Sequence, residues 1–112
     1  MDLIKQRLHY ILMETFVALA DPTRRRIVEA LTGGPLSSGQ IAARFPISAP
    51  AISQHLKALK AARLVRVRSE AQKRIYEIDP DGIEAIAGWA EGVRRHWAAK
   101  LSVLEADLKR ED

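Results

Sequence analysis

The stretch LSSGQIAARFPISAPAISQHLKALKAA (residues 36–62) contains two helix-start signals separated by a very short turn. Ser37 and Gln40 have the spacing of a capping box, in which each side chain satisfies a backbone N–H at the start of a helix. Ser48, which is followed two residues later by a proline, marks the start of a second helix. Two helices joined by so short an apolar turn predict a helix-turn-helix over residues 37–62.

The second of these helices separates apolar from polar residues. At about 100° per residue, Ile52, Leu56 and Leu59 fall on one side, with Arg63 close to them. The opposite side is small, polar and basic, which suits a helix that enters the major groove of DNA, where Gln and Ser can hydrogen-bond to base edges. An ordinary solvent-facing helix side is the alternative. The residues of the polar side are Pro50, Gln54, Lys57 and Ala61, with Ser53 and Lys60 at its margin.

A basic hairpin follows. Residues 64–68 alternate, with Val65 and Val67 on one face and arginines on the other, and after a polar segment residues 74–78 return as a second strand. The sequence therefore predicts a two-stranded wing over residues 64–78. Its tip would present basic side chains to a phosphate backbone, although a hairpin that only faces solvent is the alternative. These side chains are Arg68, Lys73 and Arg74.

Positive charge is concentrated in this part of the chain. Residues 36–74 carry eight basic side chains and one acidic side chain, a net charge of +7, whereas the whole chain of 112 residues carries only +4. The remaining residues therefore sum to −3. Such clustering is typical of a protein that binds nucleic acid.

Four segments together resemble the ArsR family of bacterial winged-helix repressors: residues 18–27 (ALADPTRRRI), 36–42, 48–59 (SAPAISQHLKAL) and 64–76. The resemblance extends over roughly residues 15–108 and is closest to the SdpR-like branch, whose members repress their own synthesis without a metal. It implies a homodimer that binds a palindromic operator and represses its own or a neighbouring operon. Ala71 departs from the pattern, because many members have glycine at the tip of the wing.

The same resemblance places the start of the second helix at the DNA. It implies that Ser48, Ala49, Ser53, Gln54 and His55 lie at the end of the helix that reads bases or touches phosphates. The complete set of candidate DNA-binding residues is Ser37, Ser38, Ser48, Ala49, Pro50, Ser53, Gln54, His55, Lys57, Lys60, Arg66, Arg68, Lys73 and Arg74.

A long amphipathic helix is predicted over residues 80–108. Its apolar residues recur at steps of three and four for seven turns, which is longer than a domain of this size needs for its own core, and such a stripe usually pairs with another helix. With the apolar helix at residues 2–19 it predicts a dimer interface, whereas packing within one chain is the alternative. The candidate interface residues are Leu8, Ile11, Leu12, Phe16, Val93, Trp97, Leu101, Leu104 and Leu108.

A further helix is predicted from Asp21, its N-cap, to about Thr32, where Arg25 or Arg26 could pair with Glu29. The fold class is thus mostly α: four helices, a wing and a long fifth helix in one domain, residues 1–112. The chain has no cysteine, which fits the cytoplasm, and no stretch long and apolar enough to span a membrane.

No catalytic or metal-binding arrangement is evident, so the sequence predicts neither an enzyme nor a cofactor. The three histidines are His9, His55 and His96, and their spacing places no two of them together on one helix. Two alternatives remain. One is a metal-responsive repressor that uses only histidines and carboxylates; the other is a winged-helix module that binds proteins and binds DNA weakly. An unidentified small molecule or protein acting where the first and last helices meet would be the route of regulation.

Overall fold

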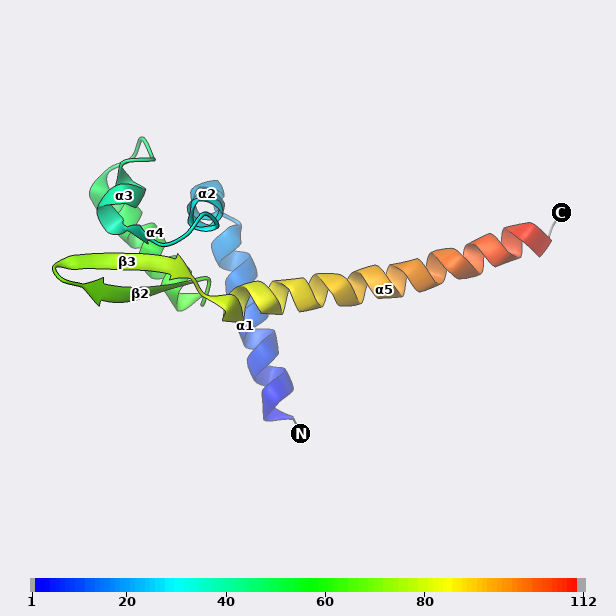
Figure 1. Cartoon of the computed structure of the whole chain (residues 1–112). Coiled ribbons are helices and arrows are strands. Elements are labelled where there is room, and N and C mark those ends of the chain that lie inside the picture. Colours follow the sequence, from blue (N-terminus) through cyan, green and yellow to red (C-terminus); the bar gives the residue numbers. More distant parts are fainter. Residues whose placement is uncertain (1, 111–112) are drawn as a thin grey trace.

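The structure is a computed structural model that describes residues 2–110, and it has a helical body from which one long helix extends (Figure 1). Its principal extents are 69 × 37 × 20 Å. The fold is a mostly helical winged helix-turn-helix, as the sequence predicts. The elements are α1 (Leu3–Leu19), α2 (Pro22–Leu31), β1 (Leu36–Ser37), α3 (Ser38–Ala42), α4 (Ala49–Ala61), β2 (Val65–Glu70), β3 (Lys73–Ile78) and α5 (Pro80–Arg110).

Side-chain caps fix the starts of the helices, as expected from the sequence. The Asp21 carboxylate accepts from the backbone N–H groups at the start of α2. In α3 the hydroxyl of Ser37 accepts from the N–H of Gln40, while the Gln40 amide oxygen accepts from the N–H of Ser37 at 2.8 Å. The Ser48 hydroxyl caps α4 by accepting from the N–H of Ala51 at 3.2 Å. These caps satisfy N–H groups that have no partner inside a helix.

The wing belongs to a three-stranded antiparallel sheet rather than to a two-stranded one. The strand order is β1-β3-β2, and β1 pairs Leu36 with Tyr76. Strand β1 is not predictable from the sequence, because two residues are too few to show an alternating pattern. Strands β2 and β3 also reach further than predicted, from Val65↔Ile78 to Glu70↔Lys73, so the turn consists of two residues.

The core lies between the helix-turn-helix and the sheet. Ile52, Leu56 and Leu59 of α4 are buried, as their shared face predicts. They pack with residues of α2, α3 and the sheet, and this packing fixes the orientation of α4. The other side of the helix is therefore left facing solvent. The other buried apolar residues are Ala18, Ile27, Val28, Leu31, Ile41, Ala62, Leu64, Val65 and Tyr76.

Helix α4 ends in a tight backbone motif. The N–H of Leu64 donates to the carbonyl of Leu59 at 3.0 Å and the N–H of Arg63 donates to that of Lys60 at 3.1 Å, which is the Schellman pattern. Arg63 has a φ of 59°, a value that usually favours glycine. The sequence analysis placed Arg63 beside the buried face of the helix. Instead it lies just beyond the helix and is only half-buried.

Helix α1 crosses the end of α4 at Thr15, which is fully buried. The Thr15 hydroxyl donates to the carbonyl of Ile11 at 2.6 Å and lies 3.4 Å from the carbonyl of Ala62. Thr15 is the polar residue on the otherwise apolar side of α1, and these contacts satisfy its buried hydroxyl.

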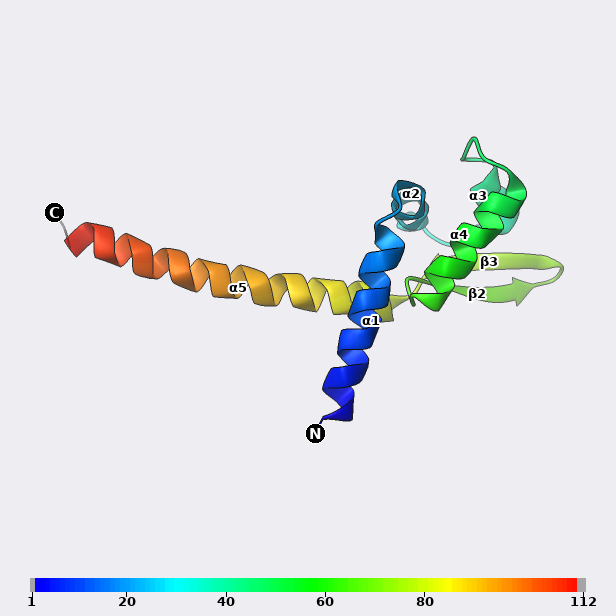
Figure 2. The same ribbon diagram turned by 180° about the vertical axis from the view of Figure 1, so that it is seen from behind.

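Only the first part of α5 packs on its own chain. Ile83 and Ile86 pack against the core, and the rings of Trp89 and Phe16 meet edge-to-face with centroids 5.1 Å apart. Beyond this point α5 extends away from the body, as both views show (Figure 1, Figure 2). Packing of the whole helix within one chain, the alternative raised by the sequence, is therefore wrong. None of the helices within residues 2–110 combines the length and apolarity that a membrane-spanning segment needs.

The basic run at the start of α2 differs from its prediction. Arg25 donates to the carbonyls of Leu19 at 2.6 Å and Ala20 at 3.3 Å, so it caps the end of α1 rather than pairing with Glu29. Arg26 is exposed, and among residues 2–110 no ion pair includes Arg26 or Glu29. Arg24 points instead toward α4.

Candidate nucleic-acid interface

The outer side of α4 is exposed, and its polar side chains have no partner among residues 2–110. Ser53, Gln54, Lys57 and Lys60 all face solvent. Within residues 2–110 none of these four side chains makes a hydrogen bond or an ion pair, while the caps and buried residues of α4 hold the helix in place. A rigid helix with unpaired donors and acceptors on its free side is what readout of a major groove requires.

His55 lies at the edge of this side and is held by α2. The Nε of Arg24 donates to Nδ1 of His55 at 3.3 Å. Because Nδ1 is engaged with Arg24, Nε2 is the ring nitrogen that is left for another partner. Sequence reasoning missed this role of Arg24, because residues 31 positions apart on two helices give no local signal.

Several predicted DNA-binding residues lie at the starts of α3 and α4. Ser37 and Ser38 are half-buried at the start of α3, and the Ser37 hydroxyl is engaged in its capping box, so it has less freedom to contact a phosphate than predicted. Ala49 and Pro50 form the exposed first turn of α4, next to Ser48. The predicted residues thus lie at the start of α3 and along the length of α4.

The basic residues of the wing are not equivalent. Glu77 on β3 pairs with Arg66 at 3.1 Å and with Arg68 at 3.2 Å, and its side chain is only 28% exposed. Glu77 lies outside the segment of residues 36–74 that carries a net charge of +7. The net positive charge of the whole wing is therefore lower than that segment indicates. Lys73 and Arg74 are exposed and make no ion pair among the residues that the structure describes.

The register shows which face each residue occupies. Arg66 lies opposite Glu77, while Val67 lies opposite buried Tyr76 on the other face of the sheet. Because side chains alternate along a strand, Arg74 shares the face of Tyr76, toward the core, and Arg66 lies on the outer face. The basic residues of the wing therefore point in two directions.

The predicted dimer-interface residues are largely uncovered in a single chain. On α5 they are 44–65% exposed, and on α1 Leu8 and Phe16 are exposed while Ile11 and Leu12 are half-buried. A continuous apolar surface of this length is uncommon on a monomer and usually marks an interface. The α5 members are Val93, Trp97, Leu101, Leu104 and Leu108.

Metal ligands do not converge in the described part of the chain. No group of three histidine or carboxylate side chains within residues 2–110 is arranged to hold a metal ion. Two acidic residues of this region are engaged locally: the carboxylate of Asp79, just before α5, accepts from the N–H of Asp81 at 3.0 Å, and Glu91 within α5 pairs with Arg94 at 2.6 Å. This hydrogen-bonded pairing lowers the pKa of Glu91.

Comparison with known proteins agrees with this architecture. Residues 19–68 match a family described as a helix-turn-helix domain. The HTH-type transcriptional regulator Rv2034 of Mycobacterium tuberculosis is 55% identical over 85 residues, which cover 76% of this chain and 77% of that protein. The chain belongs to the ArsR family of transcriptional regulators.

Further transcriptional regulators are similar over 66–86% of this chain. The transcriptional repressor SdpR of Bacillus subtilis is 38% identical over 66% of this chain and 82% of its own length. An ArsR-like transcriptional regulator from Rhodococcus sp. RHA1 has a TM-score of 0.73, 29% identity and coverage of 86% of this chain and 91% of its own. A structure described as a possible transcriptional regulator for arsenical resistance has a TM-score of 0.67 and 38% identity over 84% of this chain and 95% of its own.

Proposed function

We propose that this ArsR-family protein is a homodimeric repressor that binds a specific palindromic operator through α4 and the wing. The observation that carries the proposal is the free side of α4, on which Ser53, Gln54 and Lys57 are exposed and make no hydrogen bond or ion pair with other side chains of residues 2–110, while the opposite side packs in the core. Gln can bond bidentately to adenine in the major groove, and Ser can bond to several base edges.

The remaining candidate residues would contact the phosphate backbone. Among them, Ser37 and Ser38 would do so from the start of α3 and Ser48 from the start of α4. Lys73 and Arg74 at the tip of the wing carry free charge, so they are the strongest candidates for phosphate contacts. Arg66 and Arg68 would contribute less until their pairs with Glu77 open. His55, whose ring is held by Arg24 through Nδ1, would direct Nε2 toward the DNA.

The dimer would form along the exposed stripe of α5, joined by α1. Two copies related by a two-fold axis would place two α4 helices at half-sites about 34–36 Å apart, one turn of the duplex, so the operator should be palindromic. Repression would follow from occupation of the operator in the cytoplasm, and the likeness to SdpR supports repression rather than activation.

The test begins by selecting, from genomic fragments, the duplex that the purified protein retains. Gln54→Ala should weaken binding to that duplex by ~1–3 kcal/mol while leaving a scrambled duplex almost unaffected, because a base contact carries sequence information and a phosphate contact does not. Arg110→Ala, at the far end of α5, is the control. Equal wild-type affinity for selected and scrambled DNA would contradict the proposal.

The dimer is tested separately. Leu101→Asp places a charge in the middle of the apolar stripe and should give monomers that fail to bind the selected duplex, whereas Lys100→Asp, exposed beside it, should stay dimeric. Analytical ultracentrifugation measures the mass. A monomeric wild type at micromolar concentration would refute the homodimer.

A metal-responsive repressor is the second candidate, and no contact among residues 2–110 favours it. Ligands from two protomers would have to combine, as His9, His55 and His96 could across a dimer. Titrating the DNA-bound protein with zinc, nickel, cobalt and copper should change its affinity less than tenfold. A larger shift would favour metal sensing.

A further inference from the structure

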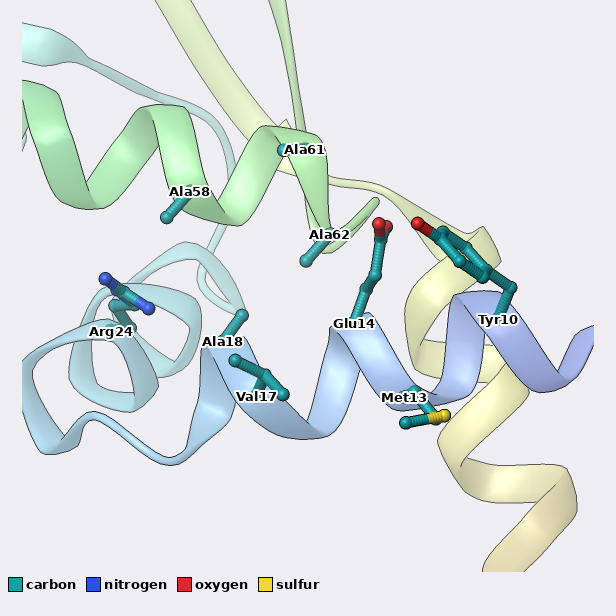
Figure 3. Close-up of a pocket in the computed structure, with 9 residues that line it drawn as sticks. All are labelled: Tyr10, Met13, Glu14, Val17, Ala18, Arg24, Ala58, Ala61 and Ala62. Atoms are coloured by element: carbon teal, nitrogen blue, oxygen red, sulfur yellow. The ribbon is translucent and has the colours of Figure 1, made fainter.

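We propose that the hollow between α1, α2 and α4 binds a small apolar carboxylic acid, with its carboxylate on Arg24, and that this ligand weakens DNA binding. The hollow has a volume of about 420 Å³, and Figure 3 shows its lining. This size lies within the range of pockets that hold small ligands. Binding of the ligand does not depend on the proposed function, whereas the effect of the ligand on DNA affinity rests on it.

Small side chains on α4 create the space. Ala58 of α4 and Ala62, just after the helix, face α1 across the hollow, where larger residues would fill it. Ala61, Val17 and Met13 lie around its margin. Six of the nine lining residues are apolar. An apolar ligand body in this open hollow would lose water where it lies against the two helices, which are joined at Thr15 and Ala62.

The polar groups lie at the two ends of the hollow. Figure 3 shows the Arg24 guanidinium at the α2 end, while the Tyr10 hydroxyl and the Glu14 carboxylate point toward the end of α4. A few polar groups around an apolar wall are what orient a ligand. Because one end is cationic and the other anionic, a ligand with a single carboxylate has one favourable orientation, with the carboxylate at Arg24.

Arg24 has donors to spare for such a group. A guanidinium has five N–H donors, and the only side-chain hydrogen bond of Arg24 within residues 2–110 uses Nε, which donates to His55. Its terminal nitrogens are left for a carboxylate, which a guanidinium binds in a forked arrangement. Since Arg24 is half-buried, the pair would be less screened than one on the open surface.

The position of Arg24 determines the sign of the effect. Arg24 touches His55, which lies on the helix proposed to enter the major groove. A bound carboxylate cancels the charge of Arg24 and brings a negative group toward the DNA phosphates. Because like charges repel, the ligand should lower DNA affinity, and this effect should shrink as salt increases.

The experiment uses three probes with the same chain and different head groups: octanoate, octylamine and octanol. Isothermal titration of the full chain without DNA should show that octanoate binds at least tenfold more tightly than the other two. Arg24→Gln should remove this preference, whereas Arg26→Gln, which removes an exposed arginine of the same helix, should keep it. Ala58→Leu, which fills the hollow, should abolish octanoate binding, whereas Ala106→Leu on exposed α5 should not.

Affinity for the selected duplex is then measured with and without saturating octanoate. A fall of fivefold or more for wild type, absent in Arg24→Gln, is expected. Failure to retain any specific duplex would count against the proposed function alone, because the titration without DNA still measures the ligand site. Octylamine or octanol binding as tightly as octanoate would overturn the ligand class. No binding of any probe, together with a changed monomer–dimer equilibrium in Ala58→Leu, would overturn the ligand site and assign the hollow to a second copy.

Discussion

The backbone N–H of Gly82 donates to the carbonyl of Arg63 at 2.9 Å, and this bond joins the first turn of α5 to the end of α4. A Cβ atom at position 82 would lie 2.5 Å from that carbonyl oxygen and 3.2 Å from Leu64, so only glycine allows this approach. An ion pair between Arg63 and Asp81 at 3.8 Å adds a weak second link. The joint sets the direction in which α5 leaves the body.

Gly82→Ala should destabilise the fold by about 2 kcal/mol, because a methyl group placed against backbone must push α5 away from α4. Thermal unfolding followed by circular dichroism measures the effect. Gly88→Ala is the matched control: it lies in the same helix with open space around it, and it should stabilise by about 0.5–1 kcal/mol because alanine favours a helix. Equal effects of the two substitutions would show that the close approach at Gly82 is not important.

Most of the fold could be predicted because its signals are local. The caps at Asp21, Ser37 and Ser48 act over two or three residues, and the apolar face of α4 repeats every turn. The free side of α4 was predictable for the same reason, since the residues opposite a buried face must face solvent or a partner.

The contacts that sequence reasoning missed join residues far apart in the chain. Arg24 meets His55, Arg63 meets Gly82, and Glu77 neutralises arginines that lie eleven and nine positions before it. Nothing in a local pattern indicates such partners, because they depend on how helices and strands pack. The free charge of the wing was overestimated for this reason.

The turn of the wing stores backbone strain. Ala71 has a φ of 56°, in the left-handed region, at the first position of the two-residue turn. Ala71→Gly should therefore stabilise the protein by about 1 kcal/mol, since the left-handed region costs a residue with a Cβ atom more than it costs glycine. Ala98→Gly, in the exposed part of α5, should instead destabilise by about 1 kcal/mol. A loss of stability in Ala71→Gly, measured by chemical denaturation, would contradict the strain.

Stability should fall in acid partly through Asp21. The pKa of Asp21 is lowered, chiefly because its carboxylate accepts from the backbone N–H of Arg24, with a further bond from Thr23. A carboxyl whose folded pKa is below its unfolded pKa stabilises the fold above the unfolded value, and this contribution disappears as pH falls through the folded value. Asp21→Asn keeps the cap without the charge, so wild type should be the more stable at pH 7 and lose its advantage below about pH 4. A difference in melting temperature that is independent of pH would contradict this assignment.

Glu77 should restrain DNA binding by the wing. Its carboxylate pairs with Arg66 and Arg68 on the outer face of the sheet, and Glu77→Gln would remove the charge that holds both guanidinium groups. Arg68 would keep only its longer pair with Glu70, at 3.6 Å. Affinity for a random duplex should rise, and the slope of log K against log salt should become steeper by about one or two units as the freed arginines reach phosphates. Because phosphate contacts carry no sequence information, the ratio of specific to random affinity should fall.

Glu29→Gln is the matched control for this prediction, since it makes the same change in net charge at an exposed side chain of α2 that has no ion pair among residues 2–110. Fluorescence anisotropy of a labelled duplex at several salt concentrations measures both the affinity and the slope. Glu29→Gln should raise affinity slightly through long-range charge and leave the slope unchanged. If both variants gave the same slope, Arg66 and Arg68 would not be contacting DNA, and Lys73 and Arg74 alone would account for the role of the wing.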